Sequence, residues 1–325
     1  MSHTVCNQGL RASCFWAIVT VLALLPAVSC RKSQQAAQTA PQKTFASPED
    51  AGAALLAAAK SGDERALIEI FGPDSKAALL TGEAGTDKAC LNDFVSAYNQ
   101  MHRWSEIRSG GEVLQIGADN YPFPMPLGRN SSGRWYFDTA AGKDEILARR
   151  IGKNELTAMD ATEAIAGAEH QYFDEAHDGD KVNQYAQKFV SDPGKQNGLY
   201  WPVAEGHTPS PLGRLGDFAN AANAGGNPEF NGYYYRILTK GGPGGGAKDY
   251  ITDGRMTSGF AVLAYPSEYR NSGIMSFLVG EDGTIYQKDL GERTADMAAA
   301  ITEYNPGDGW TAAISPAVSA SRIQP

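Results

Sequence analysis

The pattern of hydrophobic and polar positions predicts three helices near the start of the folded region. Ser47 before Pro48 is typical of an N-cap, and the Ala-rich stretch that follows is expected to end at Gly62. A second helix is predicted over residues 63–71. A third is predicted from Asn92 to Trp104, because apolar positions recur there at helical spacing. Its predicted buried stripe is Phe94, Tyr98 and Met101.

Two strand-like segments follow these helices. Residues 111–118 and 133–140 are rich in β-branched and aromatic residues, and a connection with alternating prolines joins them. Helices followed by an antiparallel pair predict an α+β domain over residues 45–141. This arrangement is compatible with an NTF2-like domain, a fold that often holds a pocket.

A long helical segment opens the second predicted domain, residues 142–315. Gly152 is expected to divide it, with Asn154 capping a second helix that reaches His177. At the end of that helix, His170, Asp174 and His177 are spaced by four and three residues. Side chains at this spacing share a helix face, which makes the three a candidate metal site. The alternative is a solvated helix end, and no second ligand-rich segment favours the metal.

The last third predicts an antiparallel meander with turns between short strands. The glycine-rich run from Lys240 to Lys248 joins two of these strands and is interpreted as a flexible, dispensable hairpin connection. A phosphate-binding loop would need Ser or Thr after its lysine, but Asp249 stands there, so no nucleotide is expected. The predicted strands lie within GYYYRILTK, RMTSGFAVLAYP, SGIMSFLVG and TIYQKDLG.

Residues 1–29 have the features of a secretion signal: a basic residue, a short apolar core and small residues before Cys30. The core of about 14 residues is shorter than the roughly 20 that span a bilayer as a helix. The tetrapeptide that ends at Cys30 resembles the bacterial lipobox, which implies cleavage before Cys30 and acylation of its thiol, for example with palmitate. Residues 30–44 then form a polar tether. Arg31 favours the outer membrane, at its periplasmic face or at the cell surface, and residues 316–325 form a tail.

Charge and cysteine content limit the remaining options. Residues 1–29 contain one basic residue, Arg11, and no acidic residue, so their removal moves the formal charge from −9 to −10. An acidic chain without a basic run argues against a nucleic-acid partner. Cys6 and Cys14 would leave with the signal and Cys30 would carry lipid. Cys90 is therefore expected to be a small buried residue with no disulfide partner in the chain.

Several long motifs, in order, resemble the bacterial DUF2950 family. The resemblance covers about residues 45–315 and implies a secreted or lipid-anchored protein of unassigned activity. The last half also resembles, more faintly, the globular heads of type IV pilins and pseudopilins, which does not imply assembly into a pilus. The motifs are ARRIGKNEL, YAQKFVSDPGKQNGLYWP, GYYYRIL, GRMTSGFAVLAYPSEY and SGIMSFLVGEDGTIYQKDLG.

Two classes of function are compatible with these observations. The first is a non-catalytic envelope lipoprotein, attached to the membrane through its anchor, that binds an envelope protein, a glycan or a small ligand without a cofactor. The second is a periplasmic or surface hydrolase that uses acidic residues such as Asp249, Asp253 and Glu268. The motifs of serine and zinc hydrolases are absent from the sequence. The binding protein is therefore the favoured interpretation.

Overall fold

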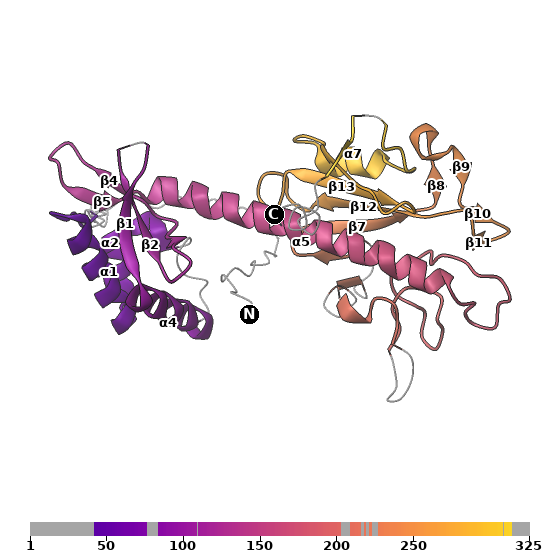
Figure 1. Ribbon diagram of the computed structural model, residues 1–325, viewed down its shortest axis with the longest axis horizontal. Helices are drawn as coiled ribbons and strands as arrows, with labels where there is room; N and C mark the ends of the chain where they lie inside the picture. Colours follow the sequence, from indigo (N-terminus) through magenta and orange to yellow (C-terminus); the bar gives the residue numbers. More distant parts are fainter. Residues whose placement is uncertain are drawn as a thin grey trace, which may run out of the picture. The chain divides into compact units, whose positions relative to one another are not determined.

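The computed structural model describes residues 42–76, 84–108, 110–202, 209–215, 218, 221–222, 227–307 and 309–313. Contacts divide the chain into two compact units, Met1–Ile146 and Leu147–Pro325. Helices and antiparallel sheets make up both units, which confirms the predicted α+β class (Figure 1). Among the described residues, no helix is both long enough and apolar enough to cross a membrane.

The N-terminal unit combines helices with a small antiparallel sheet. Its sheet has the order β1-β2-β4-β5, and β3 pairs with β2. The helices are α1 (Pro48–Ser61), α2 (Glu64–Phe71), η1 (Pro73–Ser75) and α4 (Ala84–Gln100). The strands are β1 (His102–Glu106), β2 (Glu112–Ile116), β3 (Tyr121–Pro122), β4 (Leu127–Arg129) and β5 (Trp135–Phe137).

The predicted caps set the ends of the first helix. The Ser47 hydroxyl accepts the N–H of Asp50 at 3.1 Å, and Gly62 takes a left-handed conformation with φ 65°. The third helix differs from its prediction, because α4 ends at Gln100. Trp104 lies instead in β1, where pairing with β2 outweighs helical spacing, and Met101 is 38% exposed. Phe94 and Tyr98 do pack against the core of this unit.

Helix α5 (Thr139–Phe173) is continuous, so the prediction that Gly152 divides it is wrong. A glycine inside a helix costs only about 1 kcal/mol relative to alanine, which tertiary contacts can offset. Asn154 does not cap a second helix: its Nδ2 donates to the carbonyl of Ser272 at 2.9 Å. One carboxylate oxygen of Glu155 accepts the backbone N–H groups of Ile274 and Met275, which follow Ser272 closely, each at 2.9 Å. These bonds tie this segment to the helix close to Gly152.

The C-terminal unit is built on the predicted antiparallel meander. Its sheet has the order β15-β14-β13-β12-β7-β6. The strands are β6 (Glu229–Phe230), β7 (Tyr233–Leu238), β12 (Ala261–Pro266), β13 (Met275–Gly280), β14 (Ile285–Asp289) and β15 (Thr311–Ala312). Smaller elements are η2 (Gly213–Leu215), β8 (Lys240–Gly241), η3 (Pro243–Gly245), β9 (Lys248–Asp249), β10 (Ile251–Thr252) and β11 (Arg255–Met256).

The central strand of this sheet is covered on both faces. All six residues of β12 are buried. In Figure 1 the sheet lies between α5 on one side and α7 (Thr294–Ala300) on the other. Arg236 of β7 reaches the end of α7, where its Nη2 donates to the carbonyl of Ala298 at 2.5 Å and also to that of Ile301. The Ala298 carbonyl also accepts the N–H of Ile301 at 3.2 Å, so the guanidinium adds a favourable positive charge at the C-terminal end of this helix.

The glycine-rich run forms a hairpin, because β8 pairs with β9, but it is not a loose connection. The N–H of Gly242 donates to the carbonyl of Tyr304 at 2.8 Å. The N–H of Tyr304 in turn donates to the carbonyl of Lys240 at 2.7 Å. A Cβ atom on Gly245 would overlap the Tyr304 carbonyl oxygen. The expectation of a dispensable loop is therefore wrong, because these glycines allow two backbones to approach closely.

We expect alanine at two glycines to have opposite effects on stability. Gly245→Ala should lower the free energy of unfolding by about 1–3 kcal/mol, because the new methyl group overlaps Tyr304. Gly152→Ala has open space around it in α5 and should raise the same quantity by about 0.5–1 kcal/mol. Chemical denaturation of both variants measures the difference. Equal shifts would contradict the packed hairpin.

Candidate functional site

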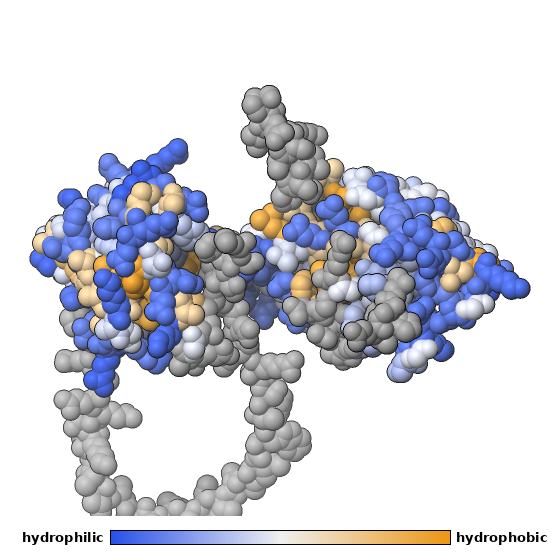
Figure 2. Space-filling model, turned by 60° about the horizontal axis from the view of Figure 1, so that its bottom comes forward, coloured by the Kyte–Doolittle hydropathy of each residue, from blue (hydrophilic) through white to orange (hydrophobic). Residues whose placement is uncertain are grey.

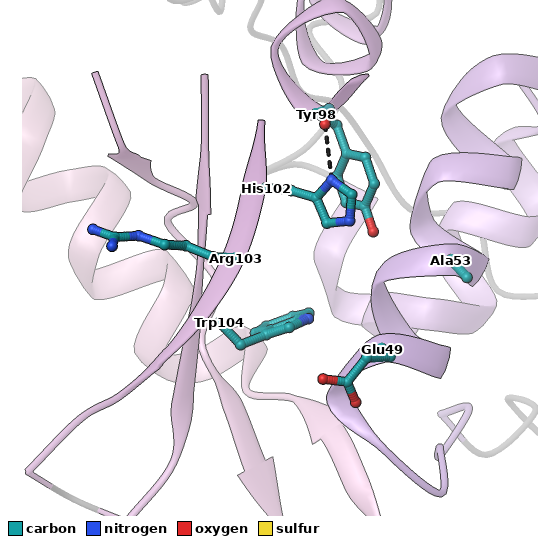
Figure 3. Close-up of a pocket in the computed structure, with 6 residues that line it drawn as sticks. All are labelled: Glu49, Ala53, Tyr98, His102, Arg103 and Trp104. Atoms are coloured by element: carbon teal, nitrogen blue, oxygen red, sulfur yellow. Dashed lines mark hydrogen bonds between the residues drawn. The ribbon is translucent and has the colours of Figure 1, made fainter. Parts of the chain in front are cut away.

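An open pocket of about 370 Å³ lies in the N-terminal unit, where α1, α4 and β1 meet (Figure 3). Its volume lies near the lower end of the range for small-molecule sites. Figure 2 shows that the surface of this unit carries hydrophobic areas bordered by hydrophilic residues. The residues that line the pocket are Glu49, Ala53, Tyr98, His102, Arg103 and Trp104.

Three aromatic rings from two elements form one side of the pocket. The rings of Tyr98 and His102 stack with centroids 3.9 Å apart and an interplanar angle of 14°. His102 Nδ1 also lies 3.0 Å from the Tyr98 carbonyl oxygen, which fixes the imidazole orientation. A Cβ atom on Gly52 of α1 would lie 2.8 Å from the Tyr98 hydroxyl and 3.3 Å from Trp104. Glycine at this position therefore lets α1 approach the rings closely.

The two charged side chains of the pocket lie in different directions. Figure 3 shows the Glu49 carboxylate facing the same space as the Trp104 ring, while Arg103 extends away from it. Arg103 Nε donates to Gln115 Oε1 on β2 at 2.6 Å. Burial raises the pKa of the Tyr98 phenol, and the charge of Glu49 raises it further. The pocket thus presents aromatic surfaces, a protonated phenol and one carboxylate.

The sequence did not reveal this pocket. Tyr98 was expected in a helical core stripe and Trp104 at the end of the same helix, whereas the structure puts Trp104 on a neighbouring strand. The sequence signal for a strand was period-2 spacing over residues 102–106, which places His102, Trp104 and Glu106 on one face. That signal is weak because the segment contains a single large apolar residue.

The three candidate metal ligands do not converge in the structure. Helix α5 ends at Phe173, so helical spacing no longer places Asp174 and His177 on the face of His170. The His170 ring lies 5.3 Å from that of Phe260, and its Nε2 is 3.1 Å from the Glu281 carbonyl oxygen. In the described parts of the chain, no group of three His, Cys, Asp or Glu side chains is arranged to hold a metal ion.

The second histidine of that trio has a different environment. The ring of His177 stacks on Tyr172 with centroids 4.0 Å apart, and its Nε2 lies 2.9 Å from the Tyr172 carbonyl oxygen. Each histidine therefore has a ring nitrogen within hydrogen-bond distance of a backbone carbonyl. His207 lies outside the described residues.

The acidic residues considered for a hydrolase lie in three different turns or hairpins. Asp249 pairs with Lys240 at 3.5 Å across the glycine-rich hairpin. Asp253 occupies the turn between β10 and β11 with φ 51°. Glu268 accepts a hydrogen bond from the side chain of Asn271, three residues further along. These partners are turn and hairpin contacts, so the structure lends no support to an acid and base pair.

A carboxyl group that the sequence analysis did not single out lies buried in the C-terminal unit. Glu169, near the end of α5, is 0% exposed. Its Oε2 accepts the N–H of Ala186 at 2.8 Å, while its Oε1 has no hydrogen-bond partner among the described residues. Burial raises the pKa of Glu169 well above the usual glutamate value, and the Ala186 bond offsets part of this. The sequence signal for this burial was helical spacing, because Glu169 lies four residues after Ile165, on the same apolar helix face as Ala161.

The phenols beside Glu169 are also held protonated. Burial raises the pKa of Tyr172 to about 12, with further contributions from the charges of Asp178 and Glu169. Burial likewise raises the pKa of Tyr185, whose hydroxyl donates to Glu281 Oε1 at 3.2 Å. This cluster joins α5 to the segment around Ala186.

Cys90 differs from its prediction. Its side chain in α4 is half-buried and forms a disulfide bond. The prediction of a cysteine without a disulfide partner concerns the processed chain, from which Cys6 and Cys14 are removed, and for that chain it stays a prediction. The other three cysteines, Cys6, Cys14 and Cys30, lie outside the described residues.

Comparison with models of protein families gives a match over most of the chain. The model of a family described as "Protein of unknown function (DUF2950)" matches residues 42–313. Searches among curated proteins and among solved structures gave no match. The expected similarities to pilin heads and to the NTF2-like fold therefore stay predictions.

We expect Glu169 to make stability depend on pH. The pKa of Glu169 is raised in the folded chain, because burial favours the neutral carboxyl group. Its contribution to the free energy of unfolding is therefore full below the usual glutamate pKa and is lost as pH rises through the folded pKa. Glu169→Gln keeps a neutral group of the same shape and should remove this component, whereas Glu163→Gln, at an exposed site of α5, should not. Urea denaturation across a pH series tests this. Parallel profiles for wild type and Glu169→Gln would refute it.

Proposed function

The chain belongs to the DUF2950 family, and we propose that it is a lipid-anchored, non-catalytic binding protein of the bacterial cell envelope. The observation that carries the proposal is the aromatic pocket of the N-terminal unit, with Trp104, Tyr98 and Glu49 around one open space. Aromatic surfaces and a few polar groups are the usual lining of binding sites.

The anchor is proposed from the sequence around Cys30, which resembles a lipobox behind a short apolar core. The tether is predicted over residues 30–44, but its last three residues belong to the folded unit. Gln42 Nε2 donates to the Phe137 carbonyl at 2.7 Å, and the N–H of Lys43 donates to the Glu69 carbonyl at 2.8 Å. The family match also begins at residue 42, so we propose residues 30–41 as the tether. Attachment through lipid would place the binding unit next to the membrane, and Arg31 favours the outer membrane, at its periplasmic face or at the cell surface.

The chemistry of the pocket supports binding more than hydrolysis. The raised pKa of Tyr98 keeps its phenol protonated, so this group donates a hydrogen bond and does not act as a base at neutral pH. Glu49 is exposed and supplies a negative charge beside Trp104. Such a site suits a ligand with a flat or cationic portion that stacks on Trp104. An envelope protein and a glycan both offer such groups.

We expect Cys30→Ser to abolish incorporation of labelled fatty acid and to separate the chain from the membrane fraction. A lipid bonded to the Cys30 sulfur also prevents a disulfide between Cys30 and Cys90, so Cys90→Ser should leave lipid labelling unchanged. Metabolic labelling followed by fractionation measures both variants. Retention of the cleaved Cys30→Ser chain in the membrane fraction would disprove the anchor.

We expect a photoreactive amino acid at position 53, which lines the pocket, to form an adduct in intact cells. The matched control is position 57, an exposed alanine one turn further along α1 that is not among the lining residues. Adding Glu49→Ala should reduce the adduct at position 53. Mass spectrometry then shows whether the adduct is protein or glycan. Equal yields at both positions, insensitive to Glu49→Ala, would count against a ligand site.

A further inference from the structure

Strand β1, which contributes half of the pocket lining, is an edge strand of its sheet. In the part of the chain that the structure describes, β1 pairs with β2 alone. The register is antiparallel, with His102 opposite Ile116 and Glu106 opposite Glu112. An edge strand presents unpaired backbone groups that can take up another strand.

The register determines which residues of β1 present these groups. Beyond one end of the strand, the N–H of Gly117 donates to the carbonyl of Met101 at 2.9 Å. Beyond the other end, the N–H of Ile107 donates to the carbonyl of Gly111 at 2.9 Å. Antiparallel pairs alternate between hydrogen-bonded and non-hydrogen-bonded positions. Because the bonded residues at both ends, Met101 and Ile107, are odd-numbered, the odd-numbered residues of β1 direct their backbone groups toward β2. The N–H and C=O groups of the three even-numbered residues therefore point to the outer edge: His102, Trp104 and Glu106.

The same three residues place their side chains on the pocket face. Successive side chains of a strand alternate between faces, so those of His102, Trp104 and Glu106 share one face, and the first two line the pocket. A strand added at this edge would have alternate side chains next to that face. The backbone edge and the pocket thus form one continuous surface.

Charge selects the side chain that would enter the pocket. Glu49 faces the pocket, and Glu106 and Glu112 lie directly opposite each other across β1 and β2. Like charges at such a position repel, and a cation between them would relieve the repulsion. Arg103 is held by Gln115 and extends away from the pocket, so it does not neutralise Glu49. A lysine or arginine over Trp104 would gain both an ion pair and a cation–π contact.

We propose that β1 binds an extended polypeptide segment as an additional strand, with a basic side chain of that segment between Trp104 and Glu49. The inference rests on the proposed function in that it uses the same pocket, and it names the class of partner. Backbone hydrogen bonds would supply affinity, and the pocket would select the basic residue.

The test uses the full-length chain in detergent and a displayed library of random nine-residue peptides. Enriched peptides should carry Lys or Arg with β-branched residues two positions away on either side. Fluorescence anisotropy of a labelled enriched peptide then gives its Kd. N-methylation of one alternate set of its amides should weaken binding by at least about tenfold, while the other set has little effect.

A pair of substitutions at Glu106 tests the same edge from the protein side. The N–H of Glu106 points outward, so Glu106→Pro removes an edge donor without removing a bond to β2. Both Glu106→Pro and Glu106→Ala remove the carboxylate, but only Glu106→Pro removes the backbone donor. Glu106→Pro should therefore bind the peptide at least about tenfold more weakly than Glu106→Ala. Thermal unfolding of both variants reports whether they fold. The methylated peptides test wild type and do not depend on either variant.

Three outcomes would overturn strand addition: no enriched peptide, equal effects of the two methylated sets, or equal binding by folded Glu106→Pro and Glu106→Ala. A position-53 adduct that proves to be a glycan, together with no enriched peptide, would overturn this inference and leave the proposed binding function standing. Absence of both the adduct and any enriched peptide would overturn both.

Discussion

Pairing of β1 with β2 in one register fixes both the faces and the edges of the N-terminal sheet. The register places Trp104 on the face that α1 and α4 cover, and it turns the backbone groups of the same residue to the outer edge. A shift by one residue would exchange these directions throughout the strand. The pocket, its ring stack and the open edge all depend on this one set of hydrogen bonds.

The C-terminal unit follows a different constraint, because its central strand is buried on both faces. A strand such as β12 needs a cover on each side, and α5 and α7 provide it. Glu169 lies without solvent contact near the end of α5, where its carboxylate accepts the N–H of Ala186. A buried carboxyl group remains neutral when its charge is not compensated, which couples the stability of this unit to pH.

At two places in the C-terminal unit, contacts with distant segments give residues a role other than the one that local sequence rules predict. Asn154 has the chemistry of a helix cap, but its side chain binds the Ser272 carbonyl, and the helix continues through Gly152. The glycine-rich run has the composition of a flexible loop, but its backbone lies against Tyr304. In both places a segment distant in sequence provides the partner. Local propensity carries no information about such partners.

The sequence by itself determined the α+β class, the capped first helix and the C-terminal meander, because these depend on local periodicity and on turn residues. Its residue pattern also led to the DUF2950 family. Only the tertiary structure decided that His170 and His177 have separate environments, that Glu169 is buried and that Trp104, Tyr98 and Glu49 share a pocket. Each of these depends on which elements pack together, and the periodicity of a single element does not contain that choice.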